Sequence, residues 1–327
     1  MKLLFLSIDT NNIGGIQTYI KMYQEGLLLK YPKSKVINIT INKNNLNLKK
    51  ILEIIIKSIK FDKIYVTHVT ILNLFFLIFF KKKITIFFYG VDIFSIRGFL
   101  VKKIFSNIDF EKYVTCSEHT KKFSIKHHKV KKDRIKVIYP YCKFELDSKS
   151  IKNVTLSDNK FIRILTVSRL EGKITKGIWL MLKALKSINK KNIFFDIVGE
   201  GSEKNSIINY INNSNLSNVK VHGFQKNLET FYEQTDFSVS ITDNAGFGIS
   251  VLDSLYFNKP CIISKNSASI EIVNNLNYPF LITDENDLDG LIKLLSNINN
   301  LNSSYYDYKN DLYYKYFSFE KYMESLV

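Results

Sequence analysis

Cysteine is scarce in this 327-residue chain, and the few cysteines follow no disulfide pattern. They are odd in number, lie far apart and include no C-x-x-C pair. A scattered set in apolar surroundings is typical of free thiols in a reducing compartment. We therefore predict buried thiols at Cys116, Cys142 and Cys261.

Long apolar runs are missing too. The most apolar stretch, VTILNLFFLIFF over residues 69–80, is too short to cross a bilayer. We predict a buried core helix there, with an interfacial helix collared by Lys81, Lys82 and Lys83 as the alternative. The opening MKLLFLSIDT reaches Asp9 after a very short apolar run, which predicts a first β-strand and not a signal peptide.

Metal and nicotinamide motifs are absent as well. The five histidines have no metal-ligand spacing, and no G-x-G-x-x-G fingerprint occurs. Asp287-Leu288-Asp289 has the form of a metal-binding D-x-D, but it opens the amphipathic run DGLIKLLSNI. We therefore predict that these acids lie in the first turn of a helix, and we expect neither a metal nor a cofactor.

Acidic residues are outnumbered in one half of the chain only. Residues 1–150 contain 28 Lys and Arg against 11 Asp and Glu, whereas residues 151–327 contain 19 of each. The whole net charge of +17 therefore lies in the first half. A biased composition would not spare the second half, so we expect the first half to meet something anionic: a membrane surface, a lipid phosphate or nucleic acid.

Apolar residues make up 46% of the chain, in strand-like runs that alternate with helical patterns. This alternation predicts parallel sheets with crossover helices, and its restart near Phe161 predicts two doubly wound α/β domains with a cleft between them. The polar stretch over residues 147–160 fits a linker. We place the domains at residues 1–155 and 156–310, followed by a last helix over 311–327.

The stretch TDNAGFGISVLDSLYFNKP, residues 242–260, places a glycine-flanked aromatic at the mouth of a predicted helix. Glycine lets the backbone approach a ligand closely, and the first amides of a helix have no internal partner. Gly246, Phe247 and Gly248 thus suit an anion such as a diphosphate. Asp253, one turn inside the helix, can accept hydrogen bonds from a diol such as ribose, or it can simply favour the positive end of the helix.

Two cations stand at another strand-to-helix turn. Arg169 directly follows a strand-like run, and Lys176 with Gly177 precedes an amphipathic helix. Cations at the carboxyl end of a strand can neutralise a leaving diphosphate; solvated loop cations are the alternative. Two further turns of this kind contain Gly14-Gly15 and Gly199.

In their order and spacing these motifs resemble glycosyltransferase family 4, a group of retaining, nucleotide-sugar-dependent enzymes. The resemblance covers almost the whole chain and implies the GT-B fold, in which two Rossmann-like domains face a cleft. Further segments that carry it are YGVD (89–92), TCSEHTKK (115–122), KVIYPYC (136–142), VHGF (221–224) and KPCIIS (259–264). The end, YKYFSFEKYMESL (314–326), resembles the helix with which family members return to the first domain.

The resemblance implies a role for each matching residue. Arg169 and Lys176 would hold the diphosphate of a UDP- or GDP-sugar, and Asp253 would bind its ribose. The remaining donor contacts, mostly through backbone amides, would be Gly14, Gly15, Gly199, Phe247, Gly248 and Ile249.

Two positions depart from the family pattern, and both belong to the sugar pocket. Ala245 stands where the family has the first glutamate of its E-x7-E motif, and Tyr89 stands where it often has a histidine. Candidate sugar contacts are therefore Tyr89, Asp92, Asp243 and Asn244.

The main functional hypothesis is transfer of a sugar to a lipid-linked or oligosaccharide acceptor during bacterial surface-glycan synthesis. The enzyme would work in the cytoplasm, at the inner face of the membrane, with its basic first half on anionic lipid. A degenerate, non-catalytic protein that binds a nucleotide sugar or a partner transferase is the first alternative, motivated by Ala245. A nucleic-acid-modifying transferase comes last, since no RNA- or DNA-recognition module is visible.

Overall fold

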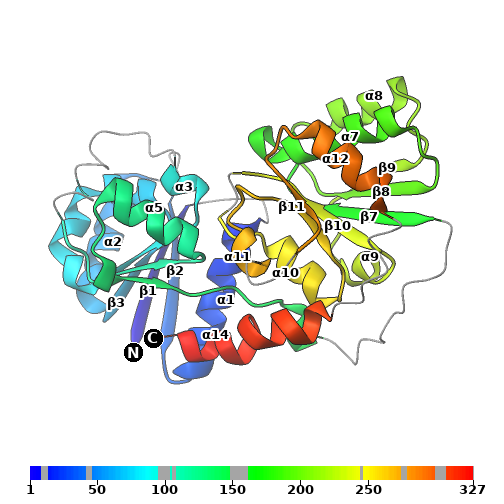
Figure 1. Ribbon diagram of the computed structural model, residues 1–327. Coiled ribbons are helices and arrows are strands. Elements are labelled where there is room, and N and C mark those ends of the chain that lie inside the picture. Colours follow the sequence, from blue (N-terminus) through cyan, green and yellow to red (C-terminus); the bar gives the residue numbers. More distant parts are fainter. Residues whose placement is uncertain are drawn as a thin grey trace. The chain divides into compact units, whose positions relative to one another are not determined.

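The chain, described here by a computed structural model, divides into two compact units (Figure 1). The first comprises Met1–Pro140 with Tyr322–Val327, and the second comprises Tyr141–Lys321. Within the described residues, each unit contains a six-stranded parallel sheet, which confirms the prediction of two doubly wound α/β folds. The structure describes residues 1–8, 14–41, 46–94, 104, 108–147, 161–243, 246–273, 278–298 and 307–326.

The sheet of the first unit has the strand order β2-β1-β3-β4-β5-β6, and every neighbouring pair is parallel. Residues 3–6 of β1 are fully buried, as expected for a strand with both faces covered. The strand order reverses between β1 and β3, the place where doubly wound sheets bind ligands. The strands are β1 (Lys2–Ile8), β2 (Lys35–Ile41), β3 (Lys63–Val66), β4 (Ile84–Phe88), β5 (Lys112–Thr115) and β6 (Ile135–Val137).

Helices connect these strands, and polar side chains cap two of the α-helices. Asn47 accepts a hydrogen bond from the amide of Lys50 at 2.9 Å, and Ser117 accepts one from the amide of Thr120 at 3.0 Å. Such caps satisfy amides that have no partner inside the helix. The helical segments are α1 (Gly15–Lys30), α2 (Leu48–Lys60), α3 (Val91–Phe94), α5 (Glu118–His128) and the 3₁₀ segments η1 (Val69–Asn73), η2 (Phe75–Lys83) and η3 (Lys132–Arg134).

The apolar stretch 69–80 is not the α-helix that its sequence predicts. It forms η1 and η2, which are 3₁₀ segments. Its β-branched and aromatic residues lose side-chain freedom in an α-helix, which weakens that alternative. Packing on the core was predicted correctly for part of the stretch, because Val69, Ile71, Leu72 and Leu77 are buried there, whereas Phe79 is 87% exposed. In the described part of the chain no helix combines the length and the apolar character needed to span a membrane.

The sheet of the second unit has the order β12-β11-β10-β7-β8-β9, again with parallel neighbours. Its order reverses between β7 and β10, so their connections to the following helices open side by side. The strands are β7 (Ile162–Val167), β8 (Ile193–Val198), β9 (Val219–Gly223), β10 (Phe237–Ser240), β11 (Cys261–Ser264) and β12 (Leu281–Ile282).

The helices of the second unit include the amphipathic α7, which packs against α12 (Figure 1). The helical segments are α6 (Phe144–Asp147), η4 (Gly172–Thr175), α7 (Lys176–Ile188), α8 (Lys204–Asn213), α9 (Glu229–Glu233), α10 (Ile249–Tyr256), α11 (Ile270–Val273), α12 (Leu288–Ser296) and the π-helix η5 (Lys309–Tyr314).

The end of the chain packs against α1. Helix α14 (Phe319–Ser325) carries Tyr322, and a Cβ added to Gly26 of α1 would overlap the side chains of Tyr322 and Leu326. Lys30 also donates a hydrogen bond to the carbonyl of Leu326. Gly26 therefore permits this close approach.

The predicted linker falls almost entirely on residues 148–160, outside the described residues. The predicted domain limits at residues 155 and 156 fall there too, so the three proposed domain ranges stay predictions. The prediction of buried thiols is confirmed, because Cys116, Cys142 and Cys261 are buried and form no disulfide.

Candidate functional site

The two predicted cations lie in the connection between β7 and α7. Arg169 comes shortly after the end of β7, and Lys176 is the first residue of α7. Because β7 pairs with β10 at the reversal of strand order, this connection opens where ligands of such sheets bind. Both side chains are 42% exposed. The structure thus places both cations in one connection, at an accessible edge of the sheet.

A carboxylate that follows another strand of the same sheet holds the side chain of Lys176. Its Nζ forms an ion pair with Glu285, which follows β12 and has a side chain only 6% exposed. The hydrogen bond to Glu285 raises the pKa of Lys176, so its positive charge is secure at neutral pH. Arg169 has a weaker neighbour, with Nη1 lying 3.7 Å from Oε2 of Glu171.

Glu285 is in turn fixed by Asp243. The Asp243 amide donates to Oε2 of Glu285 at 3.3 Å, and the Glu285 amide donates to Oδ2 of Asp243 at 3.4 Å. Ser264, at the end of β11, donates a hydrogen bond to the other oxygen of Asp243. Asp243, a candidate sugar contact, therefore already joins the ends of β10, β11 and β12.

Glu203 fixes the turn that precedes Lys176. Its Oε2 accepts hydrogen bonds from Thr175 Oγ1 at 2.9 Å and from Trp179 Nε1 at 2.8 Å. Glu203 immediately precedes α8, so it ties the β8–α8 connection to the start of α7. The backbone that carries Lys176 is thus anchored to the neighbouring β8–α8 connection.

Gly199, predicted as a donor contact, permits two loops to meet. Its φ is +151°, and a Cβ there would overlap the carbonyl oxygen of Ser168. The backbone instead forms a hydrogen bond from the amide of Ser168 to the carbonyl of Val198 at 3.0 Å. Gly199 therefore brings the β8–α8 connection against the segment that carries Arg169.

The loop around Phe247 and Gly248 is built as its sequence predicts. Gly248 is the N-cap of α10 with φ +95°, and a Cβ there would overlap Oγ of Ser269. Ser269, itself fully buried, donates to the carbonyl of Phe247 at 2.7 Å. The Phe247 side chain is buried, with its ring centroid 5.8 Å from that of Phe317. The loop is therefore rigidly anchored in the second unit.

Helix α10 starts at Ile249, so its first amides lie at the carboxyl end of β10. The amides of Val251 and Leu252 turn back to the carbonyl of Gly248, at 3.0 and 3.3 Å. The amides that precede them have no partner within the helix by its geometry. With the positive end of the helix dipole they form a place for an anion.

Asp253 is a buried carboxylate inside α10. Its Oδ1 has no hydrogen-bond partner among the described residues. Burial raises its pKa to about 6, while a hydrogen bond from the Cys142 thiol and the charge of Lys143 act in the opposite direction. A buried oxygen without a partner is costly, so it is suited to accept a hydrogen bond from a ligand hydroxyl. The residue thus fits the predicted contact with a ribose.

In the first unit, Gly14 and Gly15 form the β1–α1 turn. Gly14 is the N-cap of α1, and its carbonyl accepts a hydrogen bond from the amide of Thr18 at 3.0 Å. Gly15 begins the helix. The turn follows β1, beside the reversal of strand order in that sheet.

Tyr89 and Asp92 lie together at the end of β4. The Tyr89 amide donates to Oδ1 of Asp92 at 2.9 Å, while Oδ2 of Asp92 and the Tyr89 hydroxyl have no hydrogen-bond partner in the described part of the chain. Burial raises the pKa of Asp92 to about 6. The Tyr89 ring packs against Tyr19 and Phe87, at centroid distances of 5.8 and 6.2 Å. The first unit therefore has its own pair of polar atoms that a ligand hydroxyl could satisfy.

Two positions of the predicted sugar pocket, Asn244 and Ala245, lie outside the described residues. The D-x-D at residues 287–289 is in the start of a helix, as predicted. Asp287 caps α12 by accepting a hydrogen bond from the amide of Gly290 at 2.9 Å, and Asp289 lies in the first turn. Among the described residues, no group of three or more His, Cys, Asp or Glu side chains is arranged to hold a metal ion.

Sequence reasoning missed three residues that shape the site: Glu203, Ser269 and Glu285. Glu203 could have been found, because it lies four residues after Gly199 in the same segment, VGEGSEK (198–204). Ser269 and Glu285 are far in sequence from the residues they hold and belong to no recognisable pattern.

The sequence of this chain is similar to those of known glycosyltransferases. Residues 147–311, half of the chain, match the family described as glycosyl transferases group 1. The O-antigen biosynthesis glycosyltransferase WclY of Escherichia coli is 29% identical over 118 residues, 36% of this chain and 33% of that protein. The poly(ribitol-phosphate) alpha-N-acetylglucosaminyltransferase of Staphylococcus aureus is 30% identical over 131 residues, 38% of this chain and 26% of that protein. The matched segment thus spans about a third or less of these relatives.

Among solved structures, HepE of Anabaena in complex with UDP and glucose has a similar fold. It superposes with a TM-score of 0.77 at 16% identity, covering 99% of this chain and 97% of that one. At this identity the likeness concerns the fold, which is of the GT-B type.

Proposed function

This chain belongs to the glycosyl transferases group 1 family, and we propose that it is a retaining transferase of glycosyltransferase family 4. Its donor is a UDP- or GDP-sugar, and its acceptor is a lipid-linked sugar or an oligosaccharide. UDP is the nucleotide bound by HepE, a protein of similar fold, which supports a donor of this class. The sugar pocket departs from the family at Ala245 and Tyr89, so the transferred sugar differs from the family's usual ones or is bound differently.

One arrangement carries this proposal: cations, helix amides and a buried carboxylate share one edge of the second sheet. Arg169 and Lys176 follow β7, and the loop of Gly248 follows the neighbouring β10. Asp253 lies one turn inside the helix that this loop opens. A nucleoside diphosphate has two anionic groups and a diol, which are the groups that these residues can bind.

The two cations would stabilise the charge that develops on the leaving group. As the bond between the anomeric carbon and the diphosphate oxygen breaks, negative charge grows on that oxygen, near Arg169 and Lys176. The acceptor hydroxyl forms the new bond on the same face of the sugar and passes its proton to the departing phosphate. In this scheme the chain needs no carboxylate nucleophile, and the two cations do the work that a metal ion does in other transferases.

The names of the relatives support a class of acceptor, and the net charge of the first half of the chain supports a location. The relatives act in O-antigen biosynthesis and on poly(ribitol-phosphate), according to their names, which supports a surface-glycan acceptor for this chain. All of the net charge of +17 belongs to residues 1–150. We therefore infer peripheral binding to an anionic membrane, on its cytoplasmic face, where nucleotide sugars are made.

A degenerate protein is the second candidate, because Ala245 has no carboxylate to offer the sugar. The ion pair of Lys176 with Glu285 and the buried, unpartnered oxygen of Asp253 favour an active enzyme. The unpartnered oxygen of Asp253 contributes nothing obvious to stability, since a buried carboxylate oxygen without a partner is costly.

A donor screen on the purified chain tests the proposal. Binding and hydrolysis are measured for a panel of UDP- and GDP-sugars, with the nucleoside monophosphates as the control for the second phosphate. We expect one donor to be hydrolysed and the diphosphates to bind more tightly than the monophosphates. Equal binding of monophosphates and diphosphates would contradict the proposed clamp.

Ala245→Glu separates the two candidates. In an active enzyme whose donor does not use that carboxylate, the added negative charge should lower turnover of the native donor about 100-fold. In a degenerate protein the wild type turns over no donor although it binds the diphosphate, and the variant gains hydrolysis.

A further inference from the structure

Helix α2 in the first unit carries more apolar surface than that unit buries. Leu48, Leu52, Ile56 and Ile59 follow one another at intervals of four, four and three residues, so they form one stripe along the helix. They are 73%, 50%, 50% and 62% exposed, respectively. The residues of α2 that the unit does bury, Ile54 and Ser58, lie on a different face. We call the four exposed side chains the α2 stripe.

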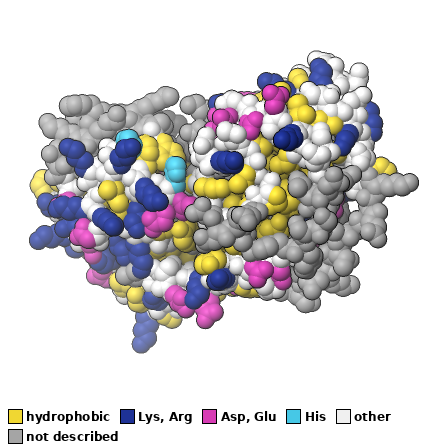
Figure 2. Space-filling model, in the orientation of Figure 1, with side chains coloured by type: hydrophobic (Ala, Val, Ile, Leu, Met, Phe, Trp, Pro, Cys, Tyr) yellow, Lys and Arg dark blue, Asp and Glu magenta, His cyan; other side chains and the backbone are white. Residues whose placement is uncertain are grey.

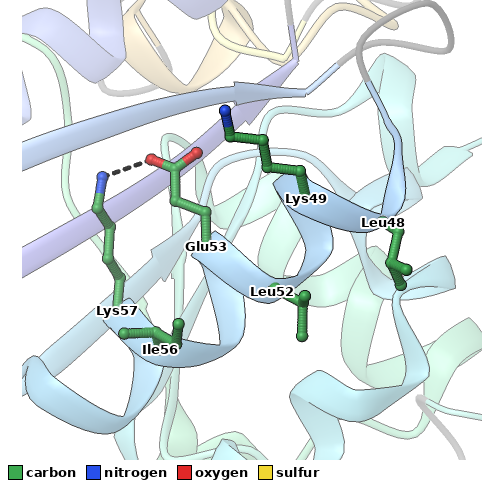
Figure 3. A pocket seen from close by; sticks show the side chains of 6 residues that line it. All are labelled: Leu48, Lys49, Leu52, Glu53, Ile56 and Lys57. Atoms are coloured by element: carbon green, nitrogen blue, oxygen red, sulfur yellow. Dashed lines mark hydrogen bonds and ion pairs between the residues drawn. The ribbon is translucent and has the colours of Figure 1, made fainter.

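The two sides of this helix are seen in Figure 3. Leu48, Leu52 and Ile56 point to one side of α2, whereas Lys49, Glu53 and Lys57 point to another, and the six line a shallow pocket. The stripe therefore ends at a row of charged side chains, the pattern of an interfacial amphipathic helix.

The charge beside the stripe is positive. Helix α2 contains four lysines, Lys49, Lys50, Lys57 and Lys60, against the single acid Glu53. Glu53 is already paired, at 2.6 Å with Lys57 and 3.2 Å with Lys50. At the 100° step of a helix, Lys49 and Lys60 flank the edge of the α2 stripe.

More positive charge lies at the carboxyl end of α2. Lys83, the last of three consecutive lysines that end η2, donates a hydrogen bond to the carbonyl of Phe61, the C-cap of α2, at 3.3 Å. Figure 2 shows Lys and Arg side chains crowded over the first unit. The α2 stripe is thus set in the basic part of the chain.

We propose that the α2 stripe inserts into the surface of an anionic lipid bilayer, with the flanking lysines at the phosphate level. Such a surface offers an apolar layer for leucine and isoleucine and, just above it, negative charge for lysine. A second copy of this chain would bring two lysine-rich helices together, and like charges oppose that contact. A nucleic acid would satisfy the lysines but leave the stripe in water.

This inference deepens the membrane partner proposed above and gives it residues. It does not depend on the donor, and vesicle binding is measured without any sugar transfer. Failure of the α2 stripe and failure of the proposed enzyme activity are therefore distinguishable.

The test is sedimentation of the full chain with vesicles of phosphatidylcholine, with and without phosphatidylglycerol. Wild type should bind the anionic vesicles and bind neutral ones weakly. Leu52→Gln with Ile56→Gln should lower the partition coefficient about 100-fold, about tenfold for each half-exposed side chain withdrawn from the lipid. Lys49→Gln with Lys60→Gln should lower it about tenfold or more at low salt and have little effect at high salt.

Leu28→Gln with Leu29→Gln is the matched control, because these leucines are exposed on α1 of the same unit. It should bind vesicles like wild type, and circular dichroism should show all variants folded. The proposal would be overturned if the α2 stripe variant bound vesicles as strongly as wild type does. It would also be overturned if wild type bound neutral and anionic vesicles equally. Loss of self-association in the stripe variant, with vesicle binding unchanged, would identify an interface between copies and overturn it as well.

Discussion

Lys176 and Glu285 form an ion pair across 109 residues of sequence. The lysine opens α7 and is half-exposed, whereas the glutamate follows β12 and is buried. A lysine side chain has many rotamers, and fixing it costs conformational entropy. Glu285 therefore prepares Lys176 for its proposed contact with the donor diphosphate, since the side chain is ordered before the ligand arrives.

A double-mutant cycle tests this positioning role. Glu285→Ala should lower turnover about tenfold, because Nζ loses the partner that orients it. The same substitution made in a Lys176→Ala background should have little further effect. Turnover is measured for the single and double variants with the preferred donor. An equal loss from Glu285→Ala in both backgrounds would show that the glutamate acts independently of Lys176.

The pKa of Asp253 predicts a pH-dependent stability. Its pKa is raised from 3.8 to about 6 by burial, so the folded state binds the proton more tightly than the unfolded chain does. The stabilisation by the bound proton is present below pH 3.8 and is lost as the pH rises through about 6. Asp253→Asn removes the buried charge and should raise the free energy of unfolding at pH 8 by up to about 3 kcal/mol. The gain should be small at pH 4, and denaturant unfolding at the two pH values measures it.

The same substitution should weaken nucleotide binding. If the unpartnered oxygen of Asp253 accepts a ribose hydroxyl, Asp253→Asn should lower the affinity for the nucleoside diphosphate about 10- to 100-fold. The 2′-deoxy and 3′-deoxy nucleotides should bind wild type less well, and this discrimination should shrink in the variant. Undiminished discrimination in the variant would assign the ribose to another residue.

Gly248 should not tolerate a side chain. Gly248→Ala meets both a positive φ and the Oγ of Ser269, whereas Gly172→Ala meets a positive φ of +51° in open space. The strained backbone alone costs about 1 kcal/mol, and the overlap at Gly248 should bring the loss to about 2–3 kcal/mol. Thermal unfolding of the two variants compares these costs. Equal melting temperatures would mean that the loop moves away from Ser269.

For the D-x-D segment, residues 287–289, we predict that a substitution has little effect. Asp289 lies in the first turn of α12 beyond its cap, so Asp289→Ala should leave turnover within about twofold of wild type and cost at most a few tenths of a kcal/mol in stability. Activity and unfolding are measured on the same preparation, with added Mn²⁺ or Mg²⁺ and with EDTA. A large loss of turnover together with a metal requirement would give this segment the catalytic role that its helix position argues against.

The sequence was most informative where pattern and structure are both local. The opening run was predicted as a first β-strand and forms β1 over residues 2–8. The strands β6 and β12, of three and two residues, were not separated from their loops, because so short a segment shows no alternation. The stretch 69–80 misled for another reason, since its apolar density indicates burial but does not choose between an α-helix and 3₁₀ turns.

The local motifs of the site could be predicted from the sequence, whereas the residues that hold them in place could not. Gly248 and Asp253 belong to one sequence motif, and in the structure that motif forms a loop followed by a helix. The partner of Lys176 is a long-range contact and could only be found from the fold. The α2 stripe illustrates the same limit, because an apolar pattern in sequence does not say how much of it the fold will cover.

The most direct measurement of the central claim is turnover of the preferred nucleotide-sugar donor by four single variants. Arg169→Ala and Lys176→Ala should each lower turnover about 100- to 1,000-fold, because each removes a cation from the developing charge of the leaving diphosphate. Arg163→Ala and Lys183→Ala remove exposed cations from β7 and α7, the adjoining strand and helix, and should retain activity. Near-normal turnover in both Arg169→Ala and Lys176→Ala would contradict the account.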